Sequence, residues 1–215
     1  MVDIILELPP FKGVSREQLS SLLESIPLDF RQYEAGSVIA HPQEDYSGVS
    51  IVLAGEVKVS QTLCSGKVKF TQQLGRGAMP GVDKLWGLYN NYECTLEPVS
   101  KVSLMHISKA HFLELLRMSE LILINYLNYI SYRNQTRSDM LHIFPGESLF
   151  DFCCHVWKAV GERRSLSTTL EATLPDLASL TGLPESSLIA QAEARPETVT
   201  IAGTSLRLHF TSRPD

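Results

Sequence analysis

The chain has 215 residues and a mass of 23.9 kDa, which is enough for one large domain or two modest ones. Hydrophobic residues make up 44% and charged residues 20%, so the composition is that of a folded protein and excludes general disorder. The net charge of −5 and the isoelectric point near 5.7 provide no overall basic field for nucleic acid or an anionic membrane. Any DNA binding must therefore come from a local patch.

The first 30 residues contain no basic segment followed by an unbroken apolar stretch, so we expect no signal peptide. The most apolar segment, residues 121–130, is interrupted by Asn125 and Asn128 and is too short to cross a bilayer. The four cysteines have neither CxxC spacing nor the density of a disulfide-rich scaffold. We therefore expect a cytoplasmic protein with no membrane partner.

Residues 15–26 place leucine and isoleucine at helical spacing behind Ser15, a suitable N-cap, and predict a short helix. From about residue 30 to residue 107, short apolar runs alternate with turns that contain glycine. Val49, Ile51 and Leu53, for example, occupy alternate positions, as expected in a half-buried strand. This region predicts an antiparallel barrel or sandwich.

After Ser108 the apolar period becomes helical, with a short helix over residues 110–118 and a long helix from about Glu120 to Phe144. Two adjacent stripes run along the long helix in alternating steps of four and three residues. The first stripe consists of Leu123, Leu127, Ile130, Asn134, Arg137, Leu141 and Phe144. The second stripe consists of Ile122, Tyr126, Tyr129, Arg133, Thr136, Met140 and Ile143.

Two neighbouring stripes indicate two buried faces, and a single barrel can cover only one of them. We therefore expect this helix to form a homodimer interface, in which Asn134 would help to fix the register. The predicted dimerisation residues are Leu123, Leu127, Ile130, Asn134 and Leu141. The alternative is a helix that is buried entirely in its own core.

Pro145 and Gly146 end the long helix, and residues 147–160 form another amphipathic helix. Cys153-Cys154-His155 in this helix resembles a metal or redox motif, but neighbouring residues on a helix point about 100° apart. We expect both cysteines to pack in the core, since Cys is among the most frequently buried residue types. Cys64 and Cys94 lie far away in the sequence, so an iron–sulfur cluster is not expected.

The C-terminal residues have the order of elements found in a winged helix-turn-helix. A linker with a short strand comes first, and Thr173 with Asp176 then resembles a capping box at the start of a helix. Gly182 follows at the turn, and a second helix begins near Pro184. Residues 198–210 predict a closing hairpin.

The order of helix, glycine-rich barrel, long helix and winged helix-turn-helix resembles the cyclic-AMP receptor protein/FNR family of bacterial transcription regulators. The local resemblance lies in residues 9–24, 35–40, 52–60 and 174–188. It implies an α+β fold with a jelly-roll, cyclic-nucleotide-binding-like barrel at 1–117, a dimerisation helix at 118–145 and a winged helix-turn-helix at 146–215. It also implies a homodimer that binds a palindromic DNA site and responds to a small molecule, haem, an iron–sulfur cluster or redox state.

In family members that bind cyclic nucleotides, a Gly-Glu pair holds the ribose and a later arginine triplet clamps the phosphate. Gly81, Val82 and Asp83 stand where Gly-Glu-Leu is expected. Tyr92, Glu93 and Cys94 align with the arginine triplet. Because Arg binds phosphate through two parallel hydrogen bonds and Glu93 would repel it, we expect no cyclic-AMP binding. The cofactor and the effector remain unassigned.

Haem is another ligand of some sensors in this family. The candidate axial ligands by residue type are His106, His111, His142, Met105 and Cys94. An isolated histidine or methionine in an apolar stretch is more often a core or surface residue than a ligand. We therefore assign no haem ligand and predict no metal site.

The predicted DNA-reading helix also departs from the family pattern. Glu185, Ser186 and Ala190 replace an arginine, a glutamate and a second arginine, and no Lys or Arg lies between Arg164 and Arg195. Since phosphate neutralisation supplies most non-specific DNA affinity, ordinary binding should be weak. The remaining base contacts fall to Ser186, Ser187 and Gln191, and phosphate contacts to Arg195 and Arg207.

The sequence thus favours a homodimeric transcription regulator that binds double-stranded DNA and whose barrel does not bind cyclic AMP. The alternative is a regulatory protein-interaction module of the same architecture that has lost DNA binding, which the missing basic residues favour. An enzyme is not expected, because the sequence contains no nucleophile–base set, zinc spacing or phosphate-cradling glycine loop.

Overall fold

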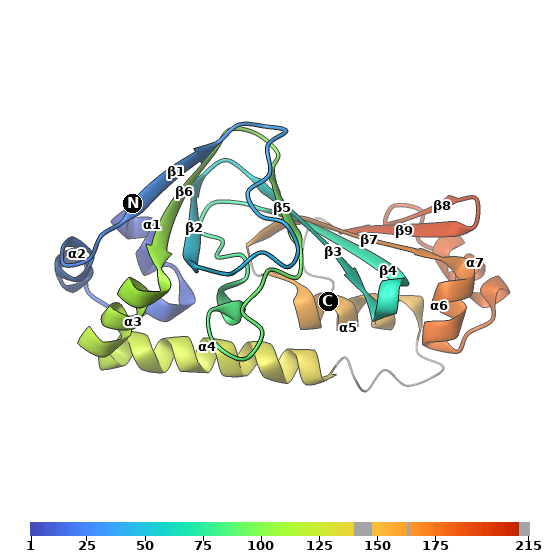
Figure 1. Cartoon of the computed structure of the whole chain (residues 1–215). Coiled ribbons are helices and arrows are strands. Elements are labelled where there is room, and N and C mark those ends of the chain that lie inside the picture. Colours follow the sequence, from blue (N-terminus) through green and yellow to red (C-terminus); the bar gives the residue numbers. More distant parts are fainter. Residues whose placement is uncertain (140–147, 163, 211–215) are drawn as a thin grey trace. The chain divides into compact units, whose positions relative to one another are not determined.

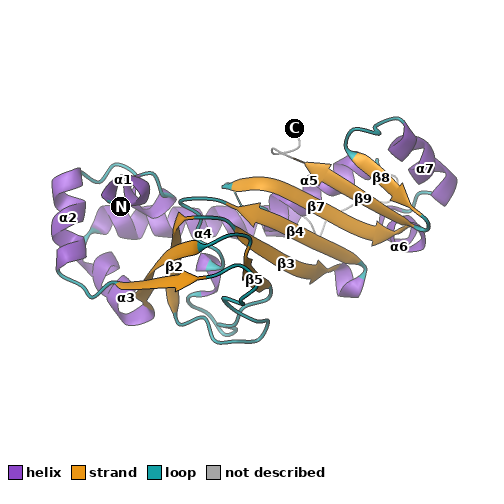
Figure 2. Ribbon diagram, turned by 90° about the horizontal axis from the view of Figure 1, so that it is seen from above, coloured by secondary structure: helices purple, strands orange, loops and turns teal. Residues whose placement is uncertain are grey.

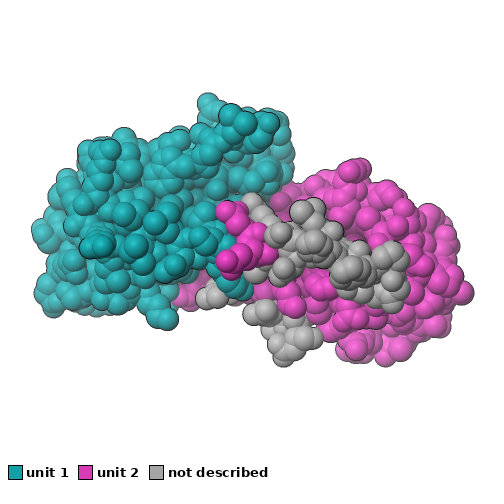
Figure 3. All heavy atoms as spheres, turned by 90° about the horizontal axis from the view of Figure 1, so that it is seen from below, with its two compact units in different colours: residues 1–59, 74–133 teal, residues 60–73, 134–215 magenta. Residues whose placement is uncertain are grey.

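The computed structural model describes residues 1–139, 148–162 and 164–210. The chain divides into two compact units, shown in Figure 3. The first unit contains residues 1–59 and 74–133, and the second contains residues 60–73 and 134–215. The segment 60–73, which lies inside the sequence predicted to form the barrel, is thus grouped with the C-terminal residues.

Three of the helices that begin in the first unit start close to the positions that the local sequence predicts. The predicted helix after Ser15 is confirmed, because the Gln18 amide donates to Ser15 Oγ at 3.1 Å. The short α1, which precedes it, was not predicted. The helices are α1 (Val2–Leu6), α2 (Arg16–Glu24), α3 (Lys109–Met118) and α4 (Glu120–Asp139). The residues predicted to continue the long helix from 140 to 144, and the Pro145-Gly146 break, lie outside the described residues.

Between residues 29 and 108, the first and last strands and the strand at residues 48–54 pair antiparallel, as the alternating pattern predicts (Figure 1). One sheet has the order β1-β6-β2, with Asp29 opposite His106 and Val49 opposite Ile107. Its strands are β1 (Asp29–Tyr33), β2 (Gly48–Ala54) and β6 (Val102–Ser108). The remaining strands are β3 (Val57–Leu63), β4 (Val68–Leu74) and β5 (Thr95–Pro98).

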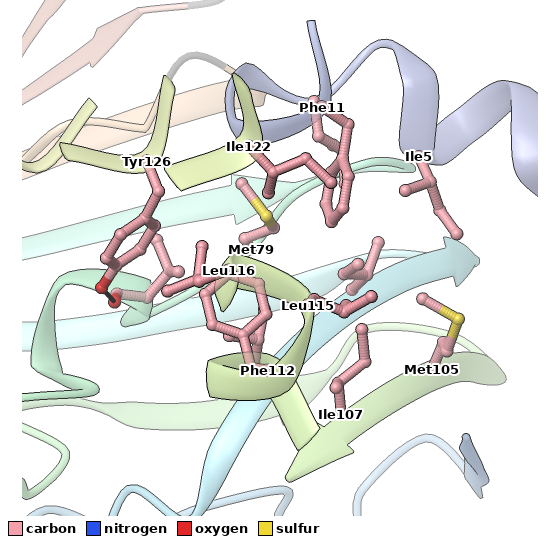
Figure 4. Packing of buried hydrophobic residues seen from close by; sticks show 14 of the residues in the cluster. Ile5, Phe11, Met79, Met105, Ile107, Phe112, Leu115, Leu116, Ile122 and Tyr126 are labelled. Carbon is pink, nitrogen blue, oxygen red and sulfur yellow. Dashed lines mark hydrogen bonds between the residues drawn. The ribbon is translucent and has the colours of Figure 1, made fainter. Parts of the chain in front are cut away.

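The first core lies between the β1-β6-β2 sheet and the helices that pack on it. Phe11, Phe112 and Ile122 are fully buried there, and Tyr126 is 5% exposed (Figure 4). Each large apolar side chain that is fully buried stabilises the fold by about 1.5–3 kcal/mol relative to its exposed state. This packing fixes the N-terminal half of α4 on the first unit.

The second unit contains three helices and a sheet. The helices are α5 (Leu149–Val160), α6 (Leu174–Thr181) and α7 (Glu185–Glu193). The strands β7 (Ser165–Thr173), β8 (Val199–Ala202) and β9 (Ser205–Phe210) pair antiparallel in the order β7-β9-β8. On its other edge β7 pairs with β4, so the complete strand order is β5-β3-β4-β7-β9-β8 (Figure 2).

The second core is formed by α5, α6, α7, the strands of the sheet and two residues of β4. Phe152, Leu177 and Leu188 are fully buried in it. Cys153 and Cys154 are buried in the same cluster or at its border, which confirms their predicted core packing. Burial raises the pKa of the Cys153 thiol, so this side chain stays protonated at neutral pH. Among the described residues, no helix is both long and apolar enough to span a bilayer.

Candidate functional site

The two predicted pocket segments, 81–83 and 92–94, are joined by Tyr46. Gly81 has a φ of 74°, and a Cβ added there would lie 2.8 Å from the Tyr46 ring, so this position requires glycine. The Tyr46 hydroxyl donates to the Pro80 carbonyl at 3.0 Å, and its ring meets that of Tyr92 edge-on at 4.9 Å. The structure therefore brings the two segments together through Tyr46, which no motif in the sequence singles out.

A buried ion pair connects the first segment to α4. Arg133 Nη2 lies 3.6 Å from Asp83 Oδ1, and the two side chains are only 8% and 3% exposed. The interior strengthens their attraction, but both groups lose their hydration, so the pair is stable only while both partners are present. Arg133 was recognised in the sequence as a stripe residue and not as part of the pocket, because nothing in the sequence indicates its partner.

A second contact from α4 reaches the neighbouring residue. The Tyr126 hydroxyl donates to the Val82 carbonyl at 3.4 Å, and the Tyr126 ring packs edge-on against Phe112 and Trp86 with centroids 5.4 Å apart in each case. Burial, together with the nearby Asp83 carboxylate, raises the pKa of Tyr126. The phenol therefore stays protonated and keeps its hydrogen bond, and α4 contacts the predicted pocket at two successive residues.

In the second segment, 92–94, the charged side chain already has a partner within the protein. Glu93 Oε1 lies 2.5 Å from Lys84 Nζ, and the lysine side chain is only 17% exposed. Burial raises the pKa of Tyr92 to about 12, so its phenol is neutral at physiological pH. Cys94 is half-buried beside the cluster that contains Leu96 and Leu104.

These contacts limit what the pocket can bind. No arginine stands at 92–94 to clamp a phosphate, and both Arg133 and Lys84 already pair with carboxylates of the chain. A ligand phosphate would have to displace Asp83 or Glu93 before it could form a bidentate contact. Glu93 does not act as the uncompensated repelling charge that the sequence suggested, since Lys84 neutralises it.

Three of the candidate haem ligands, His106, Met105 and His111, have partners or packing of their own. His106 is buried with its Nδ1 3.0 Å from Ser50 Oγ, and Met105 is fully buried in the first core. Burial and the nearby Arg31 lower the pKa of His106. His111 Nδ1 lies 2.9 Å from Ser108 Oγ at the start of α3. His142 lies outside the described residues, among which no cluster of three or more His, Cys, Asp or Glu could hold a metal ion.

The two stripes of α4 have different environments in the first unit. In the second stripe, Ile122, Tyr126 and Arg133 are buried. In the first stripe, Leu127 is 49% exposed, and Leu123 and Ile130 are only partly buried. Asn134 is exposed, and Leu141 lies outside the described residues. Among the described residues, the stripe predicted to form a dimer is therefore the more exposed of the two, with Leu127 as its most exposed apolar residue.

In the second unit, α6 and α7 are joined by a tight turn whose local signals match the sequence prediction. The Asp176 amide donates to Thr173 Oγ1 at 3.2 Å, which confirms the predicted cap of α6. Gly182 ends α6 in the left-handed conformation with a φ of 71°, and Pro184 stands at the N-cap of α7. The β8–β9 hairpin follows, and it pairs with β7.

The residues predicted to contact DNA have different positions on this surface. Ser186 is exposed on α7, whereas the Ser187 hydroxyl accepts from Gln191 Nε2 at 3.2 Å. Gln191 Oε1 in turn accepts from the Leu149 amide at 2.8 Å, so this side chain faces α5. The sequence held a signal for this, because Gln191 lies three residues after the buried Leu188 and so on the same face.

Arg195 and Arg207 also have partners inside the unit. The Arg195 guanidinium lies 4.1 Å from the centroid of the Phe150 ring, a cation–π contact. Arg207 Nη2 lies 3.1 Å from Glu171 Oε2 on the neighbouring strand. Both residues are exposed, and so is the acidic Glu185 on α7.

Comparisons with known proteins identify the fold. Residues 30–119 match the family model of the cyclic nucleotide-binding domain, and no curated protein matches the sequence. The catabolite activator protein of Thermus thermophilus is similar at 18% identity over 93% of each chain, with a TM-score of 0.56. The sensor domain of the transcriptional regulator DNR from Pseudomonas aeruginosa is 20% identical over 64% of this chain and 90% of its own, with a TM-score of 0.53.

The N-terminal domain of a transcriptional regulator from Streptomyces coelicolor is 18% identical over 64% of this chain and 96% of its own, with a TM-score of 0.51. These likenesses confirm the expected resemblance in fold. The protein thus contains a cyclic nucleotide-binding domain at residues 30–119 and has, over nearly its full length, the fold of catabolite-activator-type regulators.

Proposed function

We propose that this protein is a homodimeric, cytoplasmic, DNA-binding transcription regulator of the cyclic-AMP receptor protein/FNR type, with an N-terminal domain that does not bind cyclic AMP. The observation that carries the proposal is the α6–Gly182–α7 pair with its β8–β9 hairpin, in a chain that has the catabolite activator protein fold. In a winged helix-turn-helix, the second helix enters the major groove and the hairpin lies beside the phosphate backbone. We assign these roles to α7 and to β8–β9.

The proposed dimer is supported by the partly exposed first stripe of α4. A palindromic site is read by two recognition helices related by a two-fold axis, so the DNA-binding form needs two copies of α7. Leu123, Leu127 and Ile130 provide an apolar face on which a second α4 could pack. Dimerisation through this face would present both copies of α7 to one operator.

The absence of cyclic-AMP binding is proposed from the pocket's own ion pairs. Asp83 with Arg133 and Glu93 with Lys84 satisfy the charges that a phosphate would need. The signal to which the domain responds must then differ from a cyclic nucleotide, or the domain serves as a fixed scaffold for α4.

The test of DNA binding is a selection of genomic fragments with the purified full-length protein at low salt. Recovery of a palindromic sequence is the expected result, and its footprint should cover two half-sites about one helical turn apart. Because Ser186 is the exposed polar residue among the predicted base contacts, Ser186→Ala should weaken binding at one base position per half-site. Recovery of no preferred sequence would contradict the proposal.

A charge variant tests whether α7 faces the groove. Glu185 and Ala190 are both exposed on α7, and Glu185→Arg with Ala190→Arg restores the arginines of the family pattern. The double variant should raise DNA affinity at low salt and steepen the dependence of log affinity on log salt by about two units. Ser21→Arg with Glu24→Arg, at exposed positions of α2, adds the same charge elsewhere and serves as the control.

One observation favours the second candidate, a protein-interaction module without DNA binding. The stretch 165–194 contains no Lys or Arg, and Glu185 and Glu193 are exposed on α7. An acidic face of this kind repels phosphates. If the arginine double variant gains no more DNA affinity than its control, α7 does not face the groove and the interaction module becomes the better explanation.

A further inference from the structure

One strand of the N-terminal sequence contributes to two separate cores. On β4, Val68 and Phe70 are buried in the second core with Leu170 and Ala172 of β7. Leu74, at the end of the same strand, is buried in a cluster of the first unit. The β3–β4 hairpin, residues 60–73, is therefore part of the fold of the second unit while its two ends continue into the first.

Polar contacts also attach this hairpin to β7 and to the residues just before it. Gln72 is 2% exposed; its Nε2 donates to Thr168 Oγ1 at 3.3 Å and its Oε1 accepts from the Glu162 amide at 3.1 Å. The Ser167 hydroxyl donates to Gln73 Oε1 at 3.0 Å. A buried amide with partners on both its atoms specifies one register of the hairpin, because any shift would leave it unpaired.

The hairpin also reaches the helix pair. Lys67 Nζ donates to Ser179 Oγ on α6 at 2.8 Å, and Lys69 is exposed on the next outward-facing position of β4. The stretch 165–194 has no Lys or Arg of its own. The docked hairpin therefore adds two cations to a part of the second unit that is otherwise acidic.

We propose that the β3–β4 hairpin is a detachable strand of the second unit: when docked on β7 it holds α6 and α7 in the DNA-binding state, and its release weakens DNA binding. Figure 2 shows β4 of the hairpin beside β7, with β3 on the other side of β4. Release would expose the backbone edge of β7 and the side chain of Leu170 to water, which costs free energy. A favourable change elsewhere in the chain must offset this cost. The part of this proposal that concerns DNA rests on the proposed function, whereas the docking itself does not.

Hydrogen exchange of the full-length protein, followed by mass spectrometry, tests the docking. Phe70→Ala should accelerate exchange in β7 and α5 by roughly 100-fold or more, because it leaves a cavity in the second core. The matched control is Leu74→Ala, four residues along the same strand, which should accelerate exchange in the first unit instead. Equal effects of the two variants on β7 would overturn the proposal.

A reversible crosslink tests whether docking of the hairpin strengthens or weakens operator binding. This test does not depend on whether Phe70→Ala folds. Gln73→Cys with Ser167→Cys, made with Cys64→Ser to avoid mispairing, replaces two side chains in direct contact on neighbouring strands. The oxidised protein should bind the selected operator at least as tightly as its reduced form and should show slower exchange in β7. Loss of operator binding on oxidation, restored by reductant, would show that the docked hairpin inhibits and would overturn the proposed sign.

Lys67→Ala provides the milder test of the same contact. It should weaken operator binding and leave the exchange of the first unit unchanged, with Lys58→Ala on β3 as the control for loss of a surface lysine. If the wild-type protein selects no DNA, the proposed function is wrong, and so is the part of this inference that concerns DNA binding. The exchange experiment then still decides whether the hairpin docks as a strand of the second unit.

Discussion

Asp83 and Arg133 form a buried ion pair. Removing one partner should destabilise the fold much more than replacing both. Both side chains are less than a tenth exposed, so removing one leaves an uncompensated buried charge. We expect Arg133→Ala to reduce the free energy of unfolding by about 3–5 kcal/mol. The combination Asp83→Leu with Arg133→Met should be much less destabilising, because it removes both charges and keeps the volume filled. Urea unfolding of the four proteins in the mutant cycle measures this, and additive single losses would contradict it.

His106 should make the protein sensitive to mild acid. Its burial, and secondarily Arg31, lower its pKa in the folded state below the ordinary value near 6.5, while Asp29 opposes this. The unfolded chain therefore binds the proton first as the pH falls, so stability is full above about pH 6.5 and declines below it. His106→Gln should reduce the difference between urea midpoints at about pH 7.5 and about pH 5.5. An unchanged difference would assign the acid sensitivity to other groups.

At the scale of elements, α4 offers the sharpest test of assembly. Leu127 is 49% exposed on the first stripe, and Leu127→Glu would place a charge in the proposed dimer seam. We expect the wild type to be a dimer by light scattering at micromolar concentration and Leu127→Glu to be a folded monomer. Asn128→Glu, at the next exposed position and off the stripe, should remain a dimer. A monomeric wild type with unchanged helicity would contradict the dimer.

Elements whose signals are local could be predicted from the sequence. Ser15 and Thr173 bond to amides three residues later, and Gly182 supplies a left-handed turn, so these boundaries depend on a few adjacent residues. The position of the hairpin 60–73 could not be predicted in the same way. Its alternating pattern predicts a strand, but the choice of β7 as partner depends on pairing across almost 100 residues.

The candidate site shows the same difference between local signals and contacts of residues that are distant in the sequence. A motif alignment assigns the segments around Gly81 and Tyr92 to a pocket, whereas the residues that contact these segments come from distant elements. Arg133 reaches Asp83 from α4, and Tyr46 joins both segments from another loop. Gln191 was expected to face DNA because of its chemistry, although its spacing from Leu188 placed it on the packed face.

For the whole molecule, the ion pairs of the pocket predict indifference to cyclic AMP. A ligand present at about 100 times its Kd stabilises the folded state by about 2.7 kcal/mol, which is a visible rise in Tm. We expect no rise with cyclic AMP and no stoichiometric heat by titration calorimetry. Asp83→Ala is the informative comparison, since it removes one of the carboxylates that a ligand phosphate would have to displace. Heat from the wild type would show that the pocket segments rearrange to bind the nucleotide.

Because β4 contributes to the cores of both units, the two units cannot be separated by one cut in the chain. The backbone passes between the two units three times, at residues 59–60, 73–74 and 133–134, so no single cut separates them. A gene fusion that joins residues 1–133 of one such chain to the C-terminal part of another would bring a foreign hairpin to β7. Such chimaeras should fold well only when residues 60–73 are transplanted together with the C-terminal part. The two units therefore cannot be exchanged independently of each other, even though each has a core of its own.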